Sequence, residues 1–391
     1  MEWPEYAIKP SSYVSGLCYS VLRLEPWTTC GLGCIYCYAR WYRGPHNRPR
    51  LKPWWPRLWR RLARLASRLE PRPWFRMSTL SEPFQGAAPH PVVLNALRVA
   101  LQNGVPLVVN TRSDAVARPE VLHLLSSMAE RGLVVVQLSL SVPGAEQLLE
   151  PLAPPTWRRL EAVEALAAHE VPVVARLQPL IPGLEERQLE VAGEALSRGA
   201  RGLVAESLRE TREGLEMLYR LLGMKPPRGW ERYETGTDPG REGLLRPPAE
   251  WRAAVHHALR AIAARYGVAY ASCKEGWLRA LAWPQWRPGR DCCHAATLLR
   301  HPIMLRPTLH EYAYLAERLG RPPAWDEFLE HCRGELSDLG YVCSGSGLEE
   351  LPRWLRRPLV LHERMLRRIV ERKGPTVVAR LLGLDAPWQL V

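Results

Sequence analysis

The stretch Cys30–Arg40, CGLGCIYCYAR, decides how this chain is interpreted. It places three cysteines in the pattern Cys30-x3-Cys34-x2-Cys37, directly after a strand-like run, LCYSVLRL, at 17–24. Pro26 and Gly31 interrupt the strand pattern, so the three cysteines are expected on a loop. In an α/β barrel, a loop that follows a strand lies on the face that carries active sites.

This cysteine spacing is typical of an iron–sulfur site. Three thiolates can bind three irons of a cubane [4Fe–4S] cluster, and the fourth iron then stays open, much as a catalytic zinc site keeps one position free. The alternatives are a zinc knuckle or half of a disulfide pair. Zinc ligands usually come as two pairs, whereas this triplet is self-contained. We therefore expect a cluster on Cys30, Cys34 and Cys37.

A regular alternation of apolar runs and helical patterns follows. It predicts strands at 74–80, 106–111, 133–141, 171–180 and 202–208, and helices at 90–103, 118–131, 155–170, 185–198 and 211–222. Apolar runs of this kind fit parallel strands that are buried on both faces. With the first strand and a helix at 58–69 they make six βα units, and right-handed repetition of such units closes toward a barrel.

The predicted fold is therefore α/β, a partial (β/α)6 TIM-type barrel with a mostly helical, cysteine-containing C-terminal extension. We expect the barrel to occupy 1–222 and a connector rich in Pro and Gly to occupy 223–248. The C-terminal domain would occupy 249–391, and its short amphipathic helices would cap the open side of the barrel.

Polar residues follow the predicted strands at the same face as the cysteines. For each one alone, a solvated loop position is the commoner explanation. Collectively they are expected to ring the rim on which the cysteine loop lies, and they are Ser81, Glu82, Arg112, Ser113, Ser139, Ser141 and Gln178.

Several segments together resemble the spore photoproduct lyase-like branch of the radical S-adenosylmethionine (SAM) superfamily. They cover roughly residues 15–210 and are GCIYCYAR (33–40), STLSEPFQG (78–86), VVNTRSD (108–114), LSLSV (138–142), LEPLAPPTWRRLEAVEAL (149–166) and PLIPGLEE (179–186). The resemblance implies an enzyme whose [4Fe–4S] cluster binds SAM and cleaves it reductively. The resulting 5′-deoxyadenosyl radical would abstract hydrogen from a substrate, with electrons supplied by a reductant protein such as a ferredoxin or flavodoxin.

The same resemblance implies positions for cofactor-binding residues. Ser81 would lie near the methionine end of SAM, Arg112 would replace a lysine that meets its carboxylate, and Ser139 would approach its ribose. The complete expected set is Tyr36, Tyr38, Ser81, Glu82, Arg112, Ser139 and Ser141.

One departure from the family pattern concerns the substrate. Thr79 stands where the family enzyme has a cysteine that donates hydrogen, and a threonine hydroxyl cannot return a hydrogen atom as a thiol does. The resemblance therefore implies radical generation without naming the substrate, the catalytic residue that acts on it, or a lyase or transferase outcome.

Five further cysteines lie within about 70 residues of the C-terminal part: Cys273, Cys292, Cys293, Cys332 and Cys343. One hypothesis is a second iron–sulfur cluster on Cys273, Cys292 or Cys293, and Cys343, with Cys332 or the other member of the adjacent pair as the fourth ligand. Zinc bound by four of these thiolates is an alternative. Disulfides are another, because the cytosol of hyperthermophiles tolerates them. His294, beside two of the cysteines, is a further candidate ligand.

Composition bounds the remaining choices. The 391 residues carry a net charge of +13, from 53 basic and 40 acidic residues, and a basic surface suits nucleic acid. An arm rich in Trp and Arg, from Trp41 to Pro56, is a candidate for substrate contact. However, only five of the basic residues are Lys and only four residues are Asn, a bias that fits a thermophile and weakens the charge argument.

The sequence also bears on location. It contains no apolar run of membrane-spanning length, and MEWPEYAIKP at the start does not resemble a secretion signal. A cytoplasmic protein without membrane contact is expected, in a compartment where thiols stay reduced.

Three functions compete at this stage. The first is a radical SAM enzyme that acts on nucleic acid. The second is a radical SAM enzyme that modifies a peptide, lipid or metabolite with help from an auxiliary cluster. The third is a zinc-dependent binding module without catalytic activity.

Overall fold

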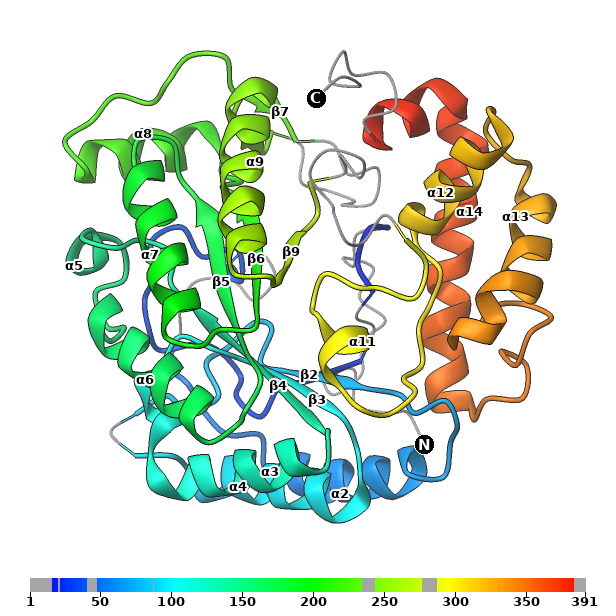
Figure 1. The fold of residues 1–391 in the computed structure, drawn as a ribbon, viewed down its shortest axis with the longest axis horizontal. Coiled ribbons are helices and arrows are strands. Elements are labelled where there is room, and N and C mark those ends of the chain that lie inside the picture. Colours follow the sequence, from blue (N-terminus) through cyan, green and yellow to red (C-terminus); the bar gives the residue numbers. More distant parts are fainter. Residues whose placement is uncertain are drawn as a thin grey trace.

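The computed structural model describes residues 16–19, 22–40, 48–86, 88–233, 243–275 and 287–382, and of 372–382 it describes only the helical backbone. Its centre is a parallel sheet with the strand order β1-β2-β3-β4-β5-β6-β9 (Figure 1). The strands are β1 (Arg23–Leu24), β2 (Phe75–Met77), β3 (Leu107–Thr111), β4 (Val134–Ser139), β5 (Val173–Leu180), β6 (Gly202–Ser207) and β9 (Ala269–Ser272).

Helices connect successive strands and pack on the outer face of the sheet. They are α2 (Trp55–Ala66), α3 (Pro91–Asn103), α4 (Pro119–Glu130), α6 (Thr156–Ala168), α7 (Glu185–Ser197) and α9 (Ala249–Arg265). Helix α8 (Arg212–Leu221) instead contacts the short α5 (Glu146–Leu149), near the cysteine loop. The prediction of a partial α/β barrel is confirmed, and the predicted elements match these bounds to within a few residues, except at the short β1.

Local chemistry explains where these helices begin and end. Helix α3 begins with Pro91, whose fixed φ suits a first turn, and Gly104 ends it in the left-handed conformation at φ +64°. Helix α2 turns Trp55, Trp59 and Leu62 into the core. This confirms the interpretation of 58–69 as a barrel helix.

The sheet extends further than the six predicted units. Strand β9 pairs in parallel with β6, with Leu203 opposite Tyr270, and α9 packs on α7, β6 and β9. The seventh strand therefore comes from the segment assigned above to the C-terminal domain, and the division of the chain at residue 249 stays a prediction. Within the predicted connector, β7 (Glu231–Arg232) and β8 (Leu245–Arg246) form a small antiparallel pair.

Alternation along the strands separates two environments. Residues such as Val109, Val136 and Ala175 face the outer helices and belong to the largest hydrophobic cluster. Their neighbours Val108, Val135 and Val174 point into the barrel and pack with residues of the C-terminal part. This alternation follows from the two-residue period of a strand.

The C-terminal part covers the open side of the barrel. It contains α11 (Ala295–Leu298), α12 (Leu309–Leu319), α13 (Trp325–His331), a π-helical turn (Cys332–Leu336) and the long α14 (Arg353–Leu382). Figure 1 shows α12, α13 and α14 side by side, with α11 between them and the sheet. In the described part of the chain no helix is long and apolar enough to cross a membrane.

Candidate functional site

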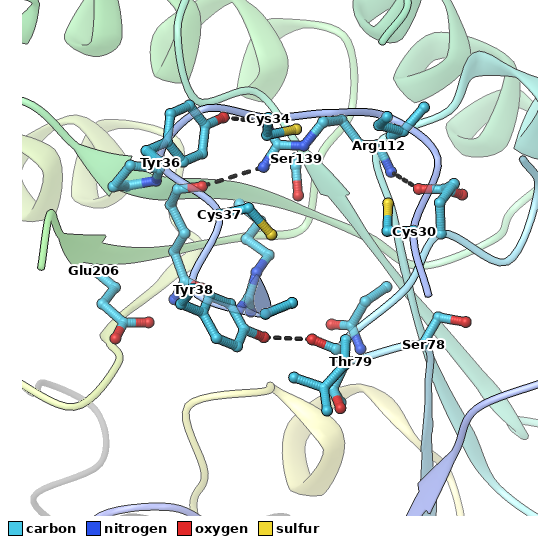
Figure 2. Close-up of a pocket in the computed structure, with 18 of the residues that line it drawn as sticks. Cys30, Cys34, Tyr36, Cys37, Tyr38, Ser78, Thr79, Arg112, Ser139 and Glu206 are labelled. Atoms are coloured by element: carbon cyan, nitrogen blue, oxygen red, sulfur yellow. Dashed lines mark hydrogen bonds between the residues drawn. The ribbon is translucent and has the colours of Figure 1, made fainter. Parts of the chain in front are cut away.

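A cavity opens at the carboxyl ends of the strands, the face at which barrel enzymes place their active sites (Figure 2). The cysteine loop forms one wall, and residues at or just beyond the ends of β2 to β6 form the rest. Its lining includes Cys30, Cys34, Tyr36, Cys37, Tyr38, Arg76, Ser78, Thr79, Ser81, Glu82, Asn110, Arg112, Ser139, Arg176, Gln178, Glu206 and Arg209.

The three cysteines of the loop all face this cavity. Cys34 is buried, whereas Cys30 and Cys37 are half-buried. Burial raises the pKa of the Cys30 and Cys34 thiols to about 12, and it also raises the pKa of Cys37. The positive charge of Arg112 opposes all three shifts. The bare thiols are thus neutral donors, and a bound metal would have to displace their protons.

Backbone contacts fix the shape of the cysteine loop. The Ile35 amide donates to the Leu149 carbonyl at 2.9 Å, which ties the loop to α5. The Gly31 amide donates to Gln85 Oε1 at 2.7 Å. Gly33 has φ +65°, a conformation that glycine adopts without strain. These contacts hold the loop independently of any bound group.

Glu150 joins the cysteine loop to the barrel. It is buried and accepts a hydrogen bond from Arg159 Nη2 at 2.7 Å, while its other oxygen meets Arg112 and the Tyr36 hydroxyl. Arg112 also lies over the Tyr36 ring, 5.5 Å from its centroid. One carboxylate therefore forms ion pairs with two guanidinium groups and positions both Arg112 and Tyr36.

Two more buried carboxylates organise the loops after β2 and β3. Glu25 Oε1 accepts from the amides of Thr79 and Leu80 at 2.7 and 2.9 Å, and Glu25 Oε2 accepts from Ser81 Oγ at 2.8 Å. Glu82 accepts from Thr111 Oγ1 at 2.6 Å and from the Arg112 amide at 2.7 Å. Burial raises the pKa of Glu82 to about 6.

The predicted cofactor-binding residues gather at this cavity with one exception. Tyr38 lines it and donates its hydroxyl hydrogen to the Thr79 carbonyl, and burial raises the pKa of this tyrosine. Ser139 lines it as well, and its carbonyl accepts from Arg159 Nη1 at 2.9 Å. Ser141 is absent from the lining, because it is buried behind the wall and donates to the Gln178 carbonyl.

Sequence reasoning missed the floor of the cavity. Arg76, Asn110, Arg176 and Glu206 lie inside β2, β3, β5 and β6, each two positions after an inward-facing apolar residue. A polar residue within an otherwise apolar parallel strand was the available signal, because such a side chain must face either a partner or a cavity. Glu25 and Glu150, which organise the rim, carried no comparable signal.

Three buried donors of the cavity have no hydrogen-bond partner within the described structure. They are Arg76 Nε, Gln178 Nε2 and Ser78 Oγ, on residues that are 7%, 8% and 3% exposed. Ser78 has φ +60°, which a non-glycine residue seldom adopts. Unpaired buried polar atoms are rare in proteins, so these donors indicate that the cavity accommodates a polar ligand.

The donor set of the cysteine loop fits a cluster better than a single ion. Among the described residues, no three His, Cys, Asp or Glu side chains converge so that they could hold one metal ion. In a cubane cluster each thiolate binds a different iron, so three ligands need only face one space without meeting at a point. Cys30, Cys34 and Cys37 satisfy that weaker requirement (Figure 2).

The C-terminal cysteines do not come together in the way that the hypothesis of a second iron–sulfur cluster required. Cys343 forms a disulfide with Cys332, with the two Cα atoms 6.6 Å apart. The expectation of Cys343 as a cluster ligand is therefore corrected in favour of the disulfide alternative. Cys273, Cys292 and Cys293 are buried free thiols.

The structure also shows where His294 and part of the Trp- and Arg-rich arm lie. His294 Nε2 contacts the Leu203 carbonyl at 3.0 Å, which accounts for that histidine as a structural residue. In the Trp- and Arg-rich arm, residues 41–47 lie outside the described residues. Trp55 is buried in the core, and Lys52 donates to the Glu25 carbonyl at 2.8 Å.

Comparisons with known proteins bear on the fold. No protein-family model matches the sequence, and a search of curated proteins found no match. Among solved structures, spore photoproduct lyase complexed with dinucleoside spore photoproduct matches with a TM-score of 0.52 and 14% identity, over 66% of this chain and 78% of that chain. This chain has the fold of spore photoproduct lyase.

Two further structures of spore photoproduct lyase agree. A single mutant matches with a TM-score of 0.53 and 14% identity, over 70% of this chain and 78% of that one. A double mutant with bound AdoMet and dinucleoside spore photoproduct matches with a TM-score of 0.52 and 14% identity, over 68% and 80%. At this identity the likeness to spore photoproduct lyase establishes the fold alone, and function has to be argued from the site.

Proposed function

We propose that this protein is a radical SAM enzyme. Cys30, Cys34 and Cys37 would hold a [4Fe–4S] cluster, and the adjoining cavity would hold SAM. The observation that carries the proposal is the placement of three loop thiols, spaced CxxxCxxC, around one cavity at the carboxyl ends of the strands. The fold shared with spore photoproduct lyase, one of whose structures contains AdoMet, supports it.

When bound, the reduced cluster and SAM supply a 5′-deoxyadenosyl radical by cleavage of a carbon–sulfur bond. The chain's own residues position the cofactor and exclude water. Glu150 holds Arg112 and Tyr36 beside the cysteine loop, so that a guanidinium group and an aromatic ring border the part of the cavity next to the three thiols. Leu32, Leu80 and Leu208 supply an apolar border that would limit access of water to a bound cofactor.

The positive charge near the thiols suits an anionic cluster. Arg112 contributes an attractive electrostatic interaction to each of the three cysteines. A cluster with thiolate ligands carries negative charge, and a nearby cation stabilises it. This is a role for Arg112 besides the contact with the SAM carboxylate that the family resemblance implies.

Nucleic acid is the first substrate class to test. The net charge of +13 and the fold shared with an enzyme complexed with a dinucleoside photoproduct support it. Thr79 lines the cavity in place of a thiol, so direct reversal of spore photoproduct by hydrogen return from that position is not expected. If binding to DNA and tRNA does not weaken as salt increases, this substrate class is wrong, because phosphate contacts dominate such affinity.

Under this proposal we also expect a ferredoxin or flavodoxin as the electron donor, and a cytoplasmic location. A second cluster or zinc would have to rest on Cys273, Cys292 and Cys293, because Cys343 is bonded to Cys332.

The proposal is tested with protein that is purified without oxygen. This protein should contain iron and sulfide in the ratio found in a [4Fe–4S] cluster. When dithionite and SAM are added, it should release 5′-deoxyadenosine. Zinc without iron and sulfide would end the enzyme proposal and favour the binding module.

A further inference from the structure

Two buried arginines on the floor of the cavity are hydrogen-bonded to neutral side chains. Arg76 of β2 is 7% exposed and Arg176 of β5 is 9% exposed, and both line the cavity. Arg76 Nη2 donates to Asn110 Oδ1 at 2.9 Å, and Arg176 Nη1 donates to Gln137 Oε1 at 2.8 Å. Both acceptors are neutral amides, and neither guanidinium group forms an ion pair with a described carboxylate.

The other arginines that line the cavity form ion pairs. Arg112 is paired with Glu150, and Arg209 is paired with Glu206. Glu82 accepts hydrogen bonds from the Thr111 hydroxyl and from the amides of Arg112 and Phe84. Among the arginines of the cavity, the two on the floor therefore differ in having no ion pair with a described carboxylate. Burial of an unpaired charge is costly unless a ligand supplies the opposite sign.

Several neighbouring groups are donors without a partner. Arg76 Nε has no hydrogen-bond partner in the described structure, and neither do Gln178 Nε2 and Ser78 Oγ, which line the same cavity. Glu206 Oε1 also has no hydrogen-bond partner there, but it forms an ion pair with Arg209. The three donors are complementary to an oxyanion, whose oxygens accept several hydrogen bonds at once.

The two arginines are also held in place. Gln137, which accepts from Arg176, donates through Nε2 to the Cys293 carbonyl at 3.1 Å. The C-terminal segment inside the barrel thus holds Gln137, which in turn holds Arg176. Asn110, which accepts from Arg76, is held in the same way, because its Nδ2 donates to the Met77 carbonyl at 3.3 Å. Such support is what a preorganised binding site requires.

We propose that Arg76 and Arg176, with Gln178 and Ser78, form a subsite for a terminal oxyanion of the substrate, a phosphate or a carboxylate. Because both guanidinium groups are buried at the floor, the oxyanion must be at the end of the molecule, and the rest of the substrate extends toward the rim and the cysteine loop. The assignment of the bound anion to a substrate rests on the proposed function. The anion subsite itself does not depend on radical chemistry.

The test measures anion binding without any turnover. Inorganic phosphate and, separately, acetate are titrated into the cluster-loaded protein in Tris–chloride buffer, and the melting temperature and the heat of binding are recorded. Wild type should show saturable stabilisation. Arg76→Gln and Arg176→Gln should each weaken binding about tenfold or more, as expected for loss of a hydrogen bond to a charged group. Arg318→Gln, at an exposed arginine paired with Glu335, is the matched control and should bind as wild type does.

Two readouts guard against a merely structural role. Without phosphate, Arg176→Gln should melt at or above the temperature of wild type, because it removes an unpaired buried charge. Gln178→Leu removes an amide donor without partner, so it should fold and should bind phosphate more weakly. Tighter binding of phosphate than of acetate would indicate a phosphorylated substrate, and the reverse would indicate a carboxylate.

Failure has distinct signatures. If neither anion binds wild type, or if the floor variants bind as well as Arg318→Gln, the subsite is wrong even when SAM is cleaved. If SAM displaces phosphate from the loaded protein, the carboxylate of SAM occupies the floor and the assignment to substrate is overturned. If phosphate binds as expected and SAM is not cleaved, the anion subsite stands and the proposed function falls.

Discussion

Eight of the nine cysteines of this protein occupy two contrasting settings. Cys30, Cys34 and Cys37 lie on a loop that faces a cavity, held by buried carboxylates and by the backbone of α5. The C-terminal cysteines lie inside an apolar cluster that fills the barrel, and two of them are joined as a disulfide. The difference teaches that local spacing brings cysteines to one cavity only where all members lie on one loop. Cysteines that are far apart in sequence acquire partners through packing.

The polar support of the first setting provides the largest predicted effect. Glu150→Ala leaves Arg159 and Arg112 buried without their carboxylate. We expect it to lower the free energy of unfolding by about 3–5 kcal/mol, as for other buried pairs broken on one side. Urea unfolding measures this, with Glu161→Ala at an exposed position of α6 as the control. A loss below about 1 kcal/mol, the usual range of a single hydrogen bond, would show that Glu150 does not hold the loop.

The disulfide of the second setting should have the next largest effect. Cys332 and Cys343 are 11 residues apart, and closing a loop of this size in the unfolded chain corresponds to about 3 kcal/mol of stability. Cys332→Ala/Cys343→Ala should lose that amount, while a reductant should not destabilise the variant further. Equal stability of wild type and variant under oxidising conditions would contradict the bond. Thiol titration of the unfolded protein gives an independent count.

His310, in the C-terminal part of the chain, makes the stability of that setting depend on pH. Burial lowers the pKa of His310 in α12 to about 3 from an unfolded value of 6.5. The unfolded chain therefore takes up a proton first as the pH falls, and stability is lost between about pH 6.5 and 3. Between pH 7 and 5 wild type should lose about 2 kcal/mol more than His310→Gln. Parallel curves for the two proteins would show that His310 is not buried as neutral imidazole.

The sequence was sufficient for most of the barrel and for placing its first cysteine set on a loop after a strand. Apolar runs that end at residues such as Gly104 and Gly132 mark strands and helices, since these glycines adopt φ near +65° where other residues would be strained. The short motifs singled out Tyr36, Tyr38 and Arg112, which line the cavity, and their contact with a cofactor stays a prediction.

Long-range neighbours could not be read from the chain. Strand β9 joins β6 across more than sixty residues, and no local pattern specifies that pairing. Arg76 and Arg176 share a cavity floor only because the sheet curves, so each one alone resembled an isolated charge in a strand. The disulfide between Cys332 and Cys343 was one of several pairings that the five C-terminal cysteines allowed, and their spacing did not distinguish it.

The central claim is that Cys30, Cys34 and Cys37 hold the cluster that activates SAM. Anaerobically reconstituted protein is compared with variants in which each of these cysteines is replaced singly by alanine, and with Cys18→Ala, a buried cysteine outside the cavity lining, as the matched control. We predict that wild type and Cys18→Ala retain the [4Fe–4S] absorption and release 5′-deoxyadenosine, and that all three loop variants lose both. Release of 5′-deoxyadenosine by any loop variant at the rate of wild type would contradict the account.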